Sequence, residues 1–296
     1  MLGHVLGTVG SLRPGRILVV VGRQKADVEA EAARFGAECV HQAERRGTGH
    51  AVLAARKALA AFPGHDVLVL PADLPLLRAG TARSLLASHR RRGNAATILS
   101  AEVGSPAGFG RIVRSPGGGI EIVEERDADA KTRAIREVNT SVYAFQAEAL
   151  LEVLPRLRAR IAGGEIYLTD AAEILSRRGM RVGVFRSPRP GDVVQVNTRT
   201  DLAKAIDALR GRKLAELGDS GVTILGPSST WVDLDAVIGP DTIVYPGAVI
   251  EGRTVIGPGC RIHPGSHIVG SRIGAGVVVR TATVIEDSTL EDGVTV

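Results

Sequence analysis

The sequence is poor in cysteine, in aromatic residues and in long apolar runs. Its two cysteines, Cys39 and Cys260, lie far apart in 296 residues and lack the spacing of metal ligands. A disulfide framework is therefore not expected, and both thiols are typical of small buried side chains in a reducing compartment. No apolar run approaches the roughly 18 residues that span a membrane, and the first residues lack a secretory-signal pattern. We expect a cytoplasmic protein.

Lysine and aromatic residues are both scarce beside a positive net charge. The formal charge is +5, and Phe, Trp and Tyr make up 3% of the chain. A nucleic-acid binder would cluster its basic residues among aromatic ones, whereas these arginines are scattered. The composition therefore predicts no nucleic-acid partner, and it leaves open a basic pocket for a small phosphorylated molecule.

The first two thirds of the chain alternate short apolar strands with amphipathic helices. At ~100–200 residues a domain, the length favours two domains, and we place the first at 1–197. The alternation predicts a mostly parallel, helix-flanked α/β sheet. The expected strands are 17–21, 38–41, 67–70 and 96–100, and the expected helices are 26–35, 48–61 and 81–91.

A different texture begins after residue 197. Apolar residues at helical spacing predict a linker helix within 198–221, and the alternative is one more surface helix of the first domain. From 222 to 296 aliphatic residues recur every six positions, with a small residue four places after each of the first five. The aliphatic positions are Ile238, Val244, Ile250, Ile256, Ile262 and Ile268, and the small ones are Thr242, Ala248, Thr254, Cys260 and Ser266. This period predicts a parallel β-helix with the aliphatic side chains inside.

A glycine-rich loop follows the strand at 38–41. Ligands of such sheets bind beyond the carboxyl ends of the strands, where this loop lies. Gly47 and Gly49 permit close backbone approach, and their amides at a helix start suit carbonyl or phosphate oxygens. Gln42 carries the amide donor and acceptor that suit a pyrimidine edge. The alternative is a plain turn with Thr48 as the N-cap.

Two further residues follow strands at the same edge and carry hard oxygen ligands. Asp73 comes after the strand at 67–70, and Asn197 ends the run Val193–Asn197. Mg²⁺ takes one or two such protein ligands together with substrate oxygens and waters. We therefore predict a shared Mg²⁺ site, and the alternative for each residue is a helix cap.

A third group of residues suits a sugar. Glu124 and Asn139 offer acceptors and a donor for hydroxyl or N-acetyl groups, and Gly110 lets a backbone N–H approach a ligand. The alternatives are a β-turn at Gly110, a solvated turn at Glu124 and a strand-end cap at Asn139.

Seven motifs in a fixed order carry a resemblance to a known family. They are Q-A-E-x-x-G-T-G-H-A, A-D-x-P-L, G-F-G-R-I, I-V-E-x-x-D-A, E-V-N-T, G-E-I-Y-L-T-D and V-N-T-R, followed by the six-residue repeat. This series resembles the bifunctional N-acetylglucosamine-1-phosphate uridylyltransferase and glucosamine-1-phosphate acetyltransferase family. The resemblance implies a Rossmann-like nucleotidyltransferase domain, a linker helix and a left-handed parallel β-helix of hexapeptide repeats.

The resemblance also implies roles for individual residues. Its substrates would be UTP and N-acetylglucosamine-1-phosphate, its product UDP-N-acetylglucosamine, and its assembly a homotrimer formed through the β-helix. Acetyl-CoA would be a substrate of the complete family member. The implied uracil contacts are Gln42, Gly47 and Thr48; the Mg²⁺ ligands Asp73 and Asn197; the N-acetylglucosamine contacts Gly110, Glu124 and Asn139; and the site lining Pro71 and Ala72.

Several departures from the family pattern lower the expected activity. Family members begin with a strand and a glycine-rich L-A-A-G-x-G-T-R-M loop, which does not precede Met1, and their acetyl-transfer histidine lies beyond Val296. Ala72 and Ser141 stand where glycine is common. We expect a fragment with very little uridylyl transfer and no acetyl transfer. The alternatives are a trimeric scaffold that binds uridine nucleotides, or a nucleotidyltransferase for another sugar phosphate.

Overall fold

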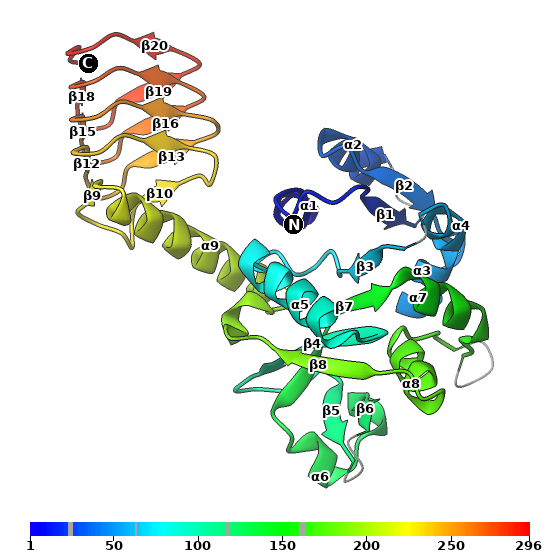
Figure 1. Cartoon of the computed structure of the whole chain (residues 1–296). Helices are drawn as coiled ribbons and strands as arrows, with labels where there is room; N and C mark the ends of the chain where they lie inside the picture. Colours follow the sequence, from blue (N-terminus) through cyan, green and yellow to red (C-terminus); the bar gives the residue numbers. More distant parts are fainter. Residues whose placement is uncertain (23–25, 63, 116–118, 160–163) are drawn as a thin grey trace. The chain divides into compact units, whose positions relative to one another are not determined.

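The structure is a computed structural model that describes residues 1–296 except 23–25, 63, 116–118 and 160–163. The chain divides into two compact units, Met1–Asn197 and Thr198–Val296. In Figure 1 the first unit runs from blue to green and the second from yellow-green to red. Each unit has its own sheets and its own hydrophobic core.

The main sheet of the first unit has the strand order β6-β5-β7-β4-β8, and β3 also pairs with β7. These strands are β3 (Asp66–Val69), β4 (Ala96–Glu102), β5 (Arg111–Arg114), β6 (Ile120–Val123), β7 (Glu137–Gln146) and β8 (Val182–Arg186). β4 is parallel to β8, whereas β7 is antiparallel to β3, β4 and β5. The expected α/β sheet is confirmed, but the expectation that it is mostly parallel is wrong for this sheet: among its described strands only β4 and β8 pair in parallel, because β7 runs against β3, β4 and β5, and β5 runs against β6.

A small parallel sheet of β1 (Leu18–Val21) and β2 (Glu38–His41) lies apart from the main one. The strands expected in the first hundred residues are all present, with ends within two residues of the prediction. The expected helix at 48–61 is broken near Ala55 into α3 and α4, and α1 was not expected. The helices are α1 (Leu2–Gly10), α2 (Ala26–Arg34), α3 (Thr48–Ala54), α4 (Arg56–Ala60), α5 (Ala79–Arg92), α6 (Ala130–Arg133), α7 (Ala147–Val153) and α8 (Thr169–Arg177), with 3-10 turns η1 (Glu125–Asp127), η2 (Leu154–Arg156) and η3 (Pro190–Asp192).

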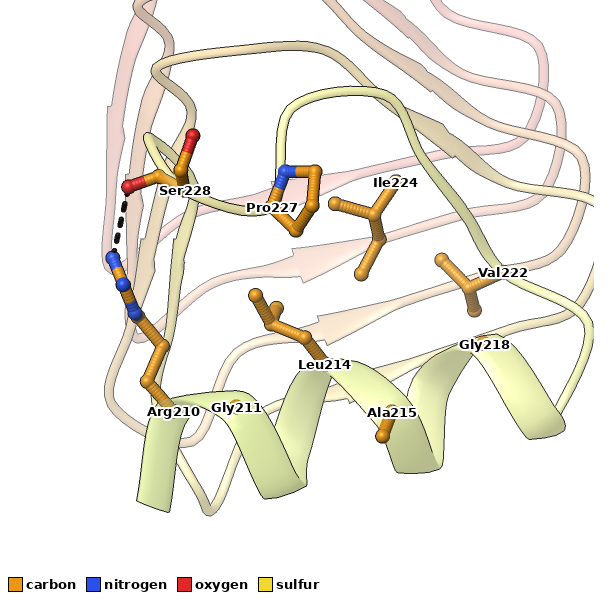
Figure 2. A pocket seen from close by; sticks show the side chains of 9 residues that line it. All are labelled: Arg210, Gly211, Leu214, Ala215, Gly218, Val222, Ile224, Pro227 and Ser228. Atoms are coloured by element: carbon orange, nitrogen blue, oxygen red, sulfur yellow. Dashed lines mark hydrogen bonds between the residues drawn. The ribbon is translucent and has the colours of Figure 1, made fainter. Parts of the chain in front are cut away.

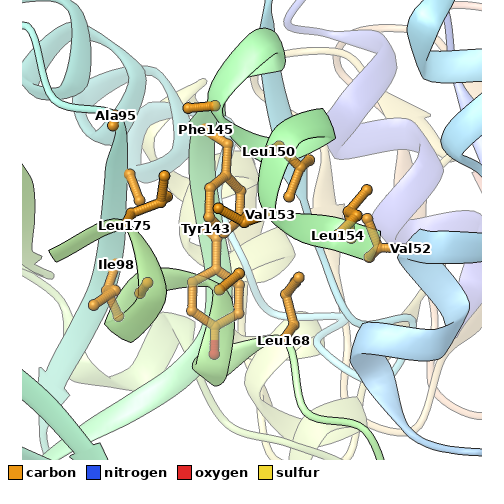
Figure 3. Packing of buried hydrophobic residues seen from close by; sticks show 14 of the residues in the cluster. Val52, Ala95, Ile98, Tyr143, Phe145, Leu150, Val153, Leu154, Leu168 and Leu175 are labelled. Atoms are coloured by element: carbon orange, nitrogen blue, oxygen red, sulfur yellow. The ribbon is translucent and has the colours of Figure 1, made fainter. Parts of the chain in front are cut away.

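The core of the first unit lies between the main sheet and its helices. Figure 3 shows side chains of β4, β7, α7 and α8 meeting there, with Val52 of α3 at the margin. The rings of Tyr143 and Phe145 on β7 are tilted, with their centroids 5.8 Å apart. β7 has paired strands on both of its edges, and most of its residues, including the predicted site residue Asn139, are buried.

The second unit opens with the helix α9 (Arg199–Asp219), where the sequence predicted a linker helix. A capping box starts it, because Thr198 and Asp201 exchange side-chain and backbone hydrogen bonds. Leu214 and Leu217 join the core of the β-helix, whereas Ile206 is 38% exposed. The expected apolar stripe is therefore buried within its own unit at its C-terminal end.

The rest of the second unit, all of it described, is the expected left-handed parallel β-helix. Its three sheets have the orders β10-β13-β16-β19, β11-β14-β17-β20 and β9-β12-β15-β18. The strands are β9 (Thr223–Ile224), β10 (Trp231–Val232), β11 (Val237–Ile238), β12 (Ile243–Val244), β13 (Val249–Glu251), β14 (Val255–Ile256), β15 (Arg261–Ile262), β16 (His267–Val269), β17 (Arg272–Ile273), β18 (Val278–Val279), β19 (Val284–Glu286) and β20 (Thr289–Leu290). The repeated aliphatic residues point inward as predicted, and Ile250, Ile262 and Ile268 are fully buried.

The small residues of the repeat are buried under the turns, also as predicted. The hydroxyl and thiol side chains among them bond to backbone carbonyls: the Thr242 hydroxyl donates to Gly257 O at 2.9 Å, and the Cys260 thiol lies 3.1 Å from Gly274 O. Coil length changes along the prism. Ile250 pairs with Ile268, 18 positions later, and Ile268 pairs with Ile285, 17 positions later. A one-residue slip in the sequence pattern thus shortens a corner.

Candidate active site

The glycine-rich loop connects β2 to α3, at the carboxyl end of β2. Its first residue is held by the sheet, because the N–H of Gln42 donates to Val21 O at 2.9 Å. The side-chain Nε2 of Gln42 lies 2.7 Å from Nδ1 of His50, which is on α3. The first residue of the loop is therefore in contact with the first turn of the helix that follows the loop.

The two loop glycines pack against a second chain segment, Glu165–Leu168. Gly47 has φ +92°, and a Cβ there would lie 2.6 Å from Ile166 O. The N–H of Gly49 donates to that same oxygen at 2.9 Å. The carbonyl oxygen that the Gly49 amide meets therefore belongs to the chain itself.

Thr48 is the first residue of α3 and Gly47 is its N-cap, so the alternative of Thr48 as the cap is wrong. The hydroxyl oxygen of Thr48 instead accepts a hydrogen bond from the Leu168 N–H at 3.1 Å. Thr48 thus adds a third tie between the glycine loop and segment 165–168. The side chain is exposed, so its other face remains open to solvent.

Asp73 lies just beyond β3, where Pro71 is half-buried and Ala72 is exposed. Its Oδ1 is inaccessible to solvent and has no hydrogen-bond partner among the described residues. Burial raises the pKa of this carboxyl above its ordinary value, against a smaller opposing effect of a backbone hydrogen bond. A buried, unpaired carboxylate oxygen is costly, and a bound cation would offset that cost.

The chain that leads to Asn197 runs beside Asp73. The Val196 N–H donates to the backbone carbonyl of Asp73 at 3.0 Å, so Asn197 follows directly after a residue bonded to Asp73. Neither residue caps a helix, because Arg78 is the N-cap of α5 and Thr198 that of α9. The helix-cap alternatives are wrong for both, and the structure brings the two predicted metal ligands to adjoining segments.

The residues predicted to bind the sugar come together around β5 and β7. A Cβ on Gly110 would lie 3.2 Å from Oε2 of Glu124, and Gly110 O accepts the N–H of Asn139 at 2.8 Å. Asn139 is inside β7, so the strand-end cap alternative is wrong. Its Nδ2 donates to the phenolic oxygen of buried Tyr143 at 2.7 Å.

Tyr143 was not singled out in the sequence, although the structure places it at the centre of this group. Burial is the main reason that its pKa is raised, and the nearby carboxylates of Glu124 and Asp170 raise it further. The phenol therefore stays neutral and keeps a hydrogen-bond function beside Asn139. Ser141, between them in sequence, has φ +60°, a backbone conformation that favours glycine.

Segment 165–170 links the glycine loop to the residues predicted to bind the sugar. Besides its bonds to the loop, it carries Tyr167, whose ring lies 5.0 Å from the Arg126 guanidinium. Its Asp170 is one of the carboxylates near Tyr143. The sequence marked this stretch as the motif G-E-I-Y-L-T-D without assigning a role to its residues, and no local pattern states what they pack against.

The arrangement at Asp73 fits a magnesium-type ion better than a zinc ion. Throughout the described part of the chain, no three His, Cys, Asp or Glu side chains gather in a metal-binding group. Mg²⁺ needs only one or two protein ligands and prefers oxygen, which Asp73 and Asn197 supply. The unpartnered Oδ1 of Asp73 is the structural observation that supports this fit.

A separate cavity of about 510 Å³ lies in the second unit between α9 and the first coil (Figure 2). Its walls are mainly small or apolar, with Gly211, Leu214 and Gly218 on the helix side. Arg210 at its rim donates to Ser228 O at 3.1 Å. The cavity has no carboxylate lining, so it does not match the chemistry of the predicted site.

No helix among the described residues is both long and apolar enough for a membrane span.

Two family models match the chain. One, described as a MobA-like NTP transferase domain, covers residues 1–165, and one described as bacterial transferase hexapeptide (six repeats) covers residues 235–270. The first match contains the glycine loop, Asp73 and the residues predicted to bind the sugar, and the second lies within the β-helix. The similarity predicted from the ordered motifs is thereby confirmed for both parts of the sequence.

Among curated proteins, the bifunctional protein GlmU of Thermobifida fusca (strain YX) is 41% identical over 302 residues, covering 99% of this chain and 59% of that protein. The bifunctional protein GlmU of Pelotomaculum thermopropionicum is 43% identical over 287 residues, covering 97% of this chain and 62% of that protein. The chain thus spans about three fifths of these relatives. A crystal structure of UDP-glucose pyrophosphorylase complexed with UDP-glucose has a TM-score of 0.56 at 14% identity, over 71% of this chain and 86% of the other, and this likeness concerns the fold alone.

Proposed function

The chain belongs to the MobA-like NTP transferase domain family, and we propose that it is a uridylyltransferase acting on N-acetylglucosamine-1-phosphate. A phosphate oxygen of the sugar phosphate would attack the α-phosphorus of UTP and expel pyrophosphate. Charge neutralisation and positioning supply most of the catalysis in such reactions. The relatives named bifunctional protein GlmU support this choice of substrates.

The observation that carries the proposal is the buried, unpartnered Oδ1 of Asp73 beside the chain that leads to Asn197. These two residues would hold Mg²⁺. When bound, the ion would supply positive charge to the phosphate oxygens. The protein's own part is to present both oxygens at the carboxyl end of β3 and to fix their spacing through the Val196–Asp73 backbone bond.

The remaining predicted residues divide between the two substrates. Gln42, Gly47 and Thr48 would contact the uracil, and Gly110, Glu124 and Asn139 the N-acetylglucosamine part. Segment 165–170 would set the distance between the two halves, because it is bonded to Thr48 at one end and adjoins Tyr143 at the other. Pro71 and Ala72 would line the site before Asp73.

The β-helix would assemble the chain as a homotrimer, and acetyl-CoA would be used by a protein carrying further coils. The hexapeptide match supports this part of the proposal. Both cysteines are free, which suits a reducing, cytoplasmic location. Light scattering coupled to size-exclusion chromatography tests assembly: a mass of three chains is expected, and a monomer at high concentration would contradict it.

Calorimetry tests the nucleotide and metal assignments on the chain as it stands. UTP with Mg²⁺ should bind more tightly than GTP with Mg²⁺, and Asp73→Asn should weaken the Mg²⁺-dependent part at least tenfold. UDP-N-acetylglucosamine should bind more tightly than UDP-glucose. Pyrophosphate release that Asp73→Asn leaves unchanged, or equal binding of both sugar nucleotides, would contradict the proposal. A third outcome, uridine-nucleotide binding without any turnover, would favour the scaffold alternative.

A further inference from the structure

The 2.7 Å contact between Gln42 Nε2 and His50 Nδ1 fixes the orientation of an amide whose two ends are chemically opposite. An amide NH₂ group only donates, so Nδ1 must be the acceptor and the imidazole proton must lie on Nε2. The carbonyl oxygen of Gln42 then points away from the ring. Among the described residues, Oε1 of Gln42 has no hydrogen-bond partner.

Both residues of the pair are held by their backbones, so the contact is not an accident of two free side chains. Gln42 is bonded to Val21 through its N–H, and His50 follows directly after Gly49, which is bonded to Ile166. The Thr48 hydroxyl ties the same turn to Leu168. Both His50 and Gln42 are half-buried, which limits the positions that their side chains can take.

We propose that His50 is a positioning residue for base selection: it holds the Gln42 amide with the oxygen and one N–H presented to the nucleotide. This inference rests on the proposed function, in which Gln42 contacts the base. Uracil presents a donor at N3 and an acceptor at O4, which match the oxygen and the N–H of an amide held in this orientation. Cytosine presents an acceptor at N3 and a donor at N4. The oxygen of the same amide would then face an acceptor, and its N–H would face a donor.

An unrestrained glutamine could not make this distinction, because turning the amide over exchanges its donor and its acceptor. With the imidazole proton on Nε2, such a turn would bring Oε1 against the lone pair of His50 Nδ1, and the hydrogen bond would be kept only if that proton moved to Nδ1. His50 therefore penalises the orientation that suits cytosine, which is selection by repulsion as well as by attraction. Thymine has the same N3 and O4 groups as uracil, so His50 does not separate those two bases.

The test compares the UTP-to-CTP affinity ratio, measured calorimetrically with Mg²⁺, in the wild type and two variants. His50→Leu removes the acceptor and should lower the ratio at least tenfold. His50→Asp keeps an acceptor at the position equivalent to Nδ1 and should hold the ratio within about threefold of wild type. The added charge of the aspartate acts equally on the two triphosphates, so it cancels in the ratio. An unchanged ratio in His50→Leu would overturn the proposal.

Two further measurements separate this inference from the function on which it rests. If wild type shows no preference for UTP over CTP, or if Gln42→Ala keeps the full preference, the assignment of Gln42 to the base has failed. Long-range ¹H–¹⁵N correlation spectra of the wild type report the His50 tautomer without any variant. A proton on Nε2 is expected, and a proton on Nδ1 would overturn the positioning role even if every His50 variant proved unstable.

Discussion

The hydroxyl of Thr81 donates a 2.7 Å hydrogen bond to Oδ2 of Asp192, and each of these residues is 1% exposed. The bond joins α5 to the 3-10 turn η3. The stretch before α5 and the stretch after η3 also meet, where the Val196 N–H is bonded to the Asp73 carbonyl. The chain that leads to Asn197 is therefore bonded at two points to the stretch that runs from Asp73 into α5.

Asp192→Ala should destabilise the first unit by about 2–4 kcal/mol, because it leaves the buried Thr81 hydroxyl without its acceptor. Arg78→Ala is the matched control. Arg78 Nε lies 3.2 Å from the other oxygen of Asp192, but the Arg78 side chain is 45% exposed and its removal leaves the Thr81 bond in place, so its loss should cost less than that of Asp192. Urea unfolding followed by circular dichroism measures both. Equal losses would contradict the ranking.

Asp73→Asn should raise the melting temperature of the metal-free protein at pH 7, by roughly 1–3 °C. The pKa of Asp73 is raised by burial, so the folded state favours the protonated carboxyl. Its stabilising effect is present at low pH and is lost as the pH rises from the ordinary value of 3.8 through the folded-state pKa. Added Mg²⁺ should then stabilise wild type and not the variant. Equal stabilisation of both by Mg²⁺ would argue against Asp73 as a ligand.

Ser141→Gly should stabilise the first unit by about 0.5–1 kcal/mol, because a residue with a Cβ is strained at φ +60°. Ser141→Ala separates this effect from loss of the hydroxyl, since alanine keeps the Cβ and the strain. Denaturant midpoints of the three proteins give the comparison. A gain in the alanine variant as large as in the glycine variant would show that the backbone is not the cause.

Stability should fall below neutral pH because of His89, which is buried at the C-terminal end of α5. Burial lowers the pKa of its imidazole, while Asp66 opposes that effect and Arg90 adds to it. A histidine with a lowered folded-state pKa stabilises fully above its ordinary pKa of 6.5, and the contribution is lost as the pH falls from that value through the folded-state pKa. His89→Asn should flatten the pH dependence between pH 7 and 5, by at most about 1.4 kcal/mol per pH unit. An identical slope in the variant would exclude His89.

Gly47→Ala should cost about 2 kcal/mol or more, because the new methyl group meets Ile166 O and the backbone keeps its positive φ. Gly36→Ala is the control: Gly36 also has a positive φ, +65°, but a Cβ there meets nothing within 4 Å. That variant should cost about 1 kcal/mol. Hydrogen exchange should show faster exchange at Ile166 and Leu168 in the Gly47 variant alone. Matching losses in the two variants would mean that packing on Ile166 is unimportant.

Trp231 offers a built-in control for all of these unit-one variants. It is the chain's only tryptophan and it lies on β10 of the β-helix. Its fluorescence therefore follows unfolding of the second unit, while circular dichroism follows both. Each variant above should shift the dichroism transition of the first unit and leave the Trp231 transition in place.

The β-helix could be predicted almost residue by residue, and the central strand of the first unit could not. Each six-residue repeat contains its own inward-facing residue and its own corner, so the local sequence pattern is sufficient to predict its structure. β7 instead contains the polar run Asn139–Ser141 within a buried strand. Its polar groups are satisfied by remote partners, such as Thr140 Oγ1 donating to Leu99 O at 2.8 Å. No nearby residue in the sequence reports such a partner.

In the candidate site, too, the sequence predicts which residues belong to the site but not what each of them contacts. Gly110, Glu124 and Asn139, which the motifs singled out, lie close together in the fold. The motifs could not show that Gly47 and Gly49 serve packing against segment 165–168, because that requires the crossing of two segments more than a hundred residues apart. The ligand roles of these residues stay predictions until binding is measured.

The β-helix repeats in sequence every six residues, but its sheets repeat only after a whole coil. Removing six residues from one coil would therefore leave every inward position filled while turning all that follows by one face of the prism. Removing eighteen would shorten the stack and turn nothing. Insertion of a whole coil would thus lengthen the stack without rotating it, whereas insertion of a single hexad would rotate the later coils and change the direction in which their surface faces.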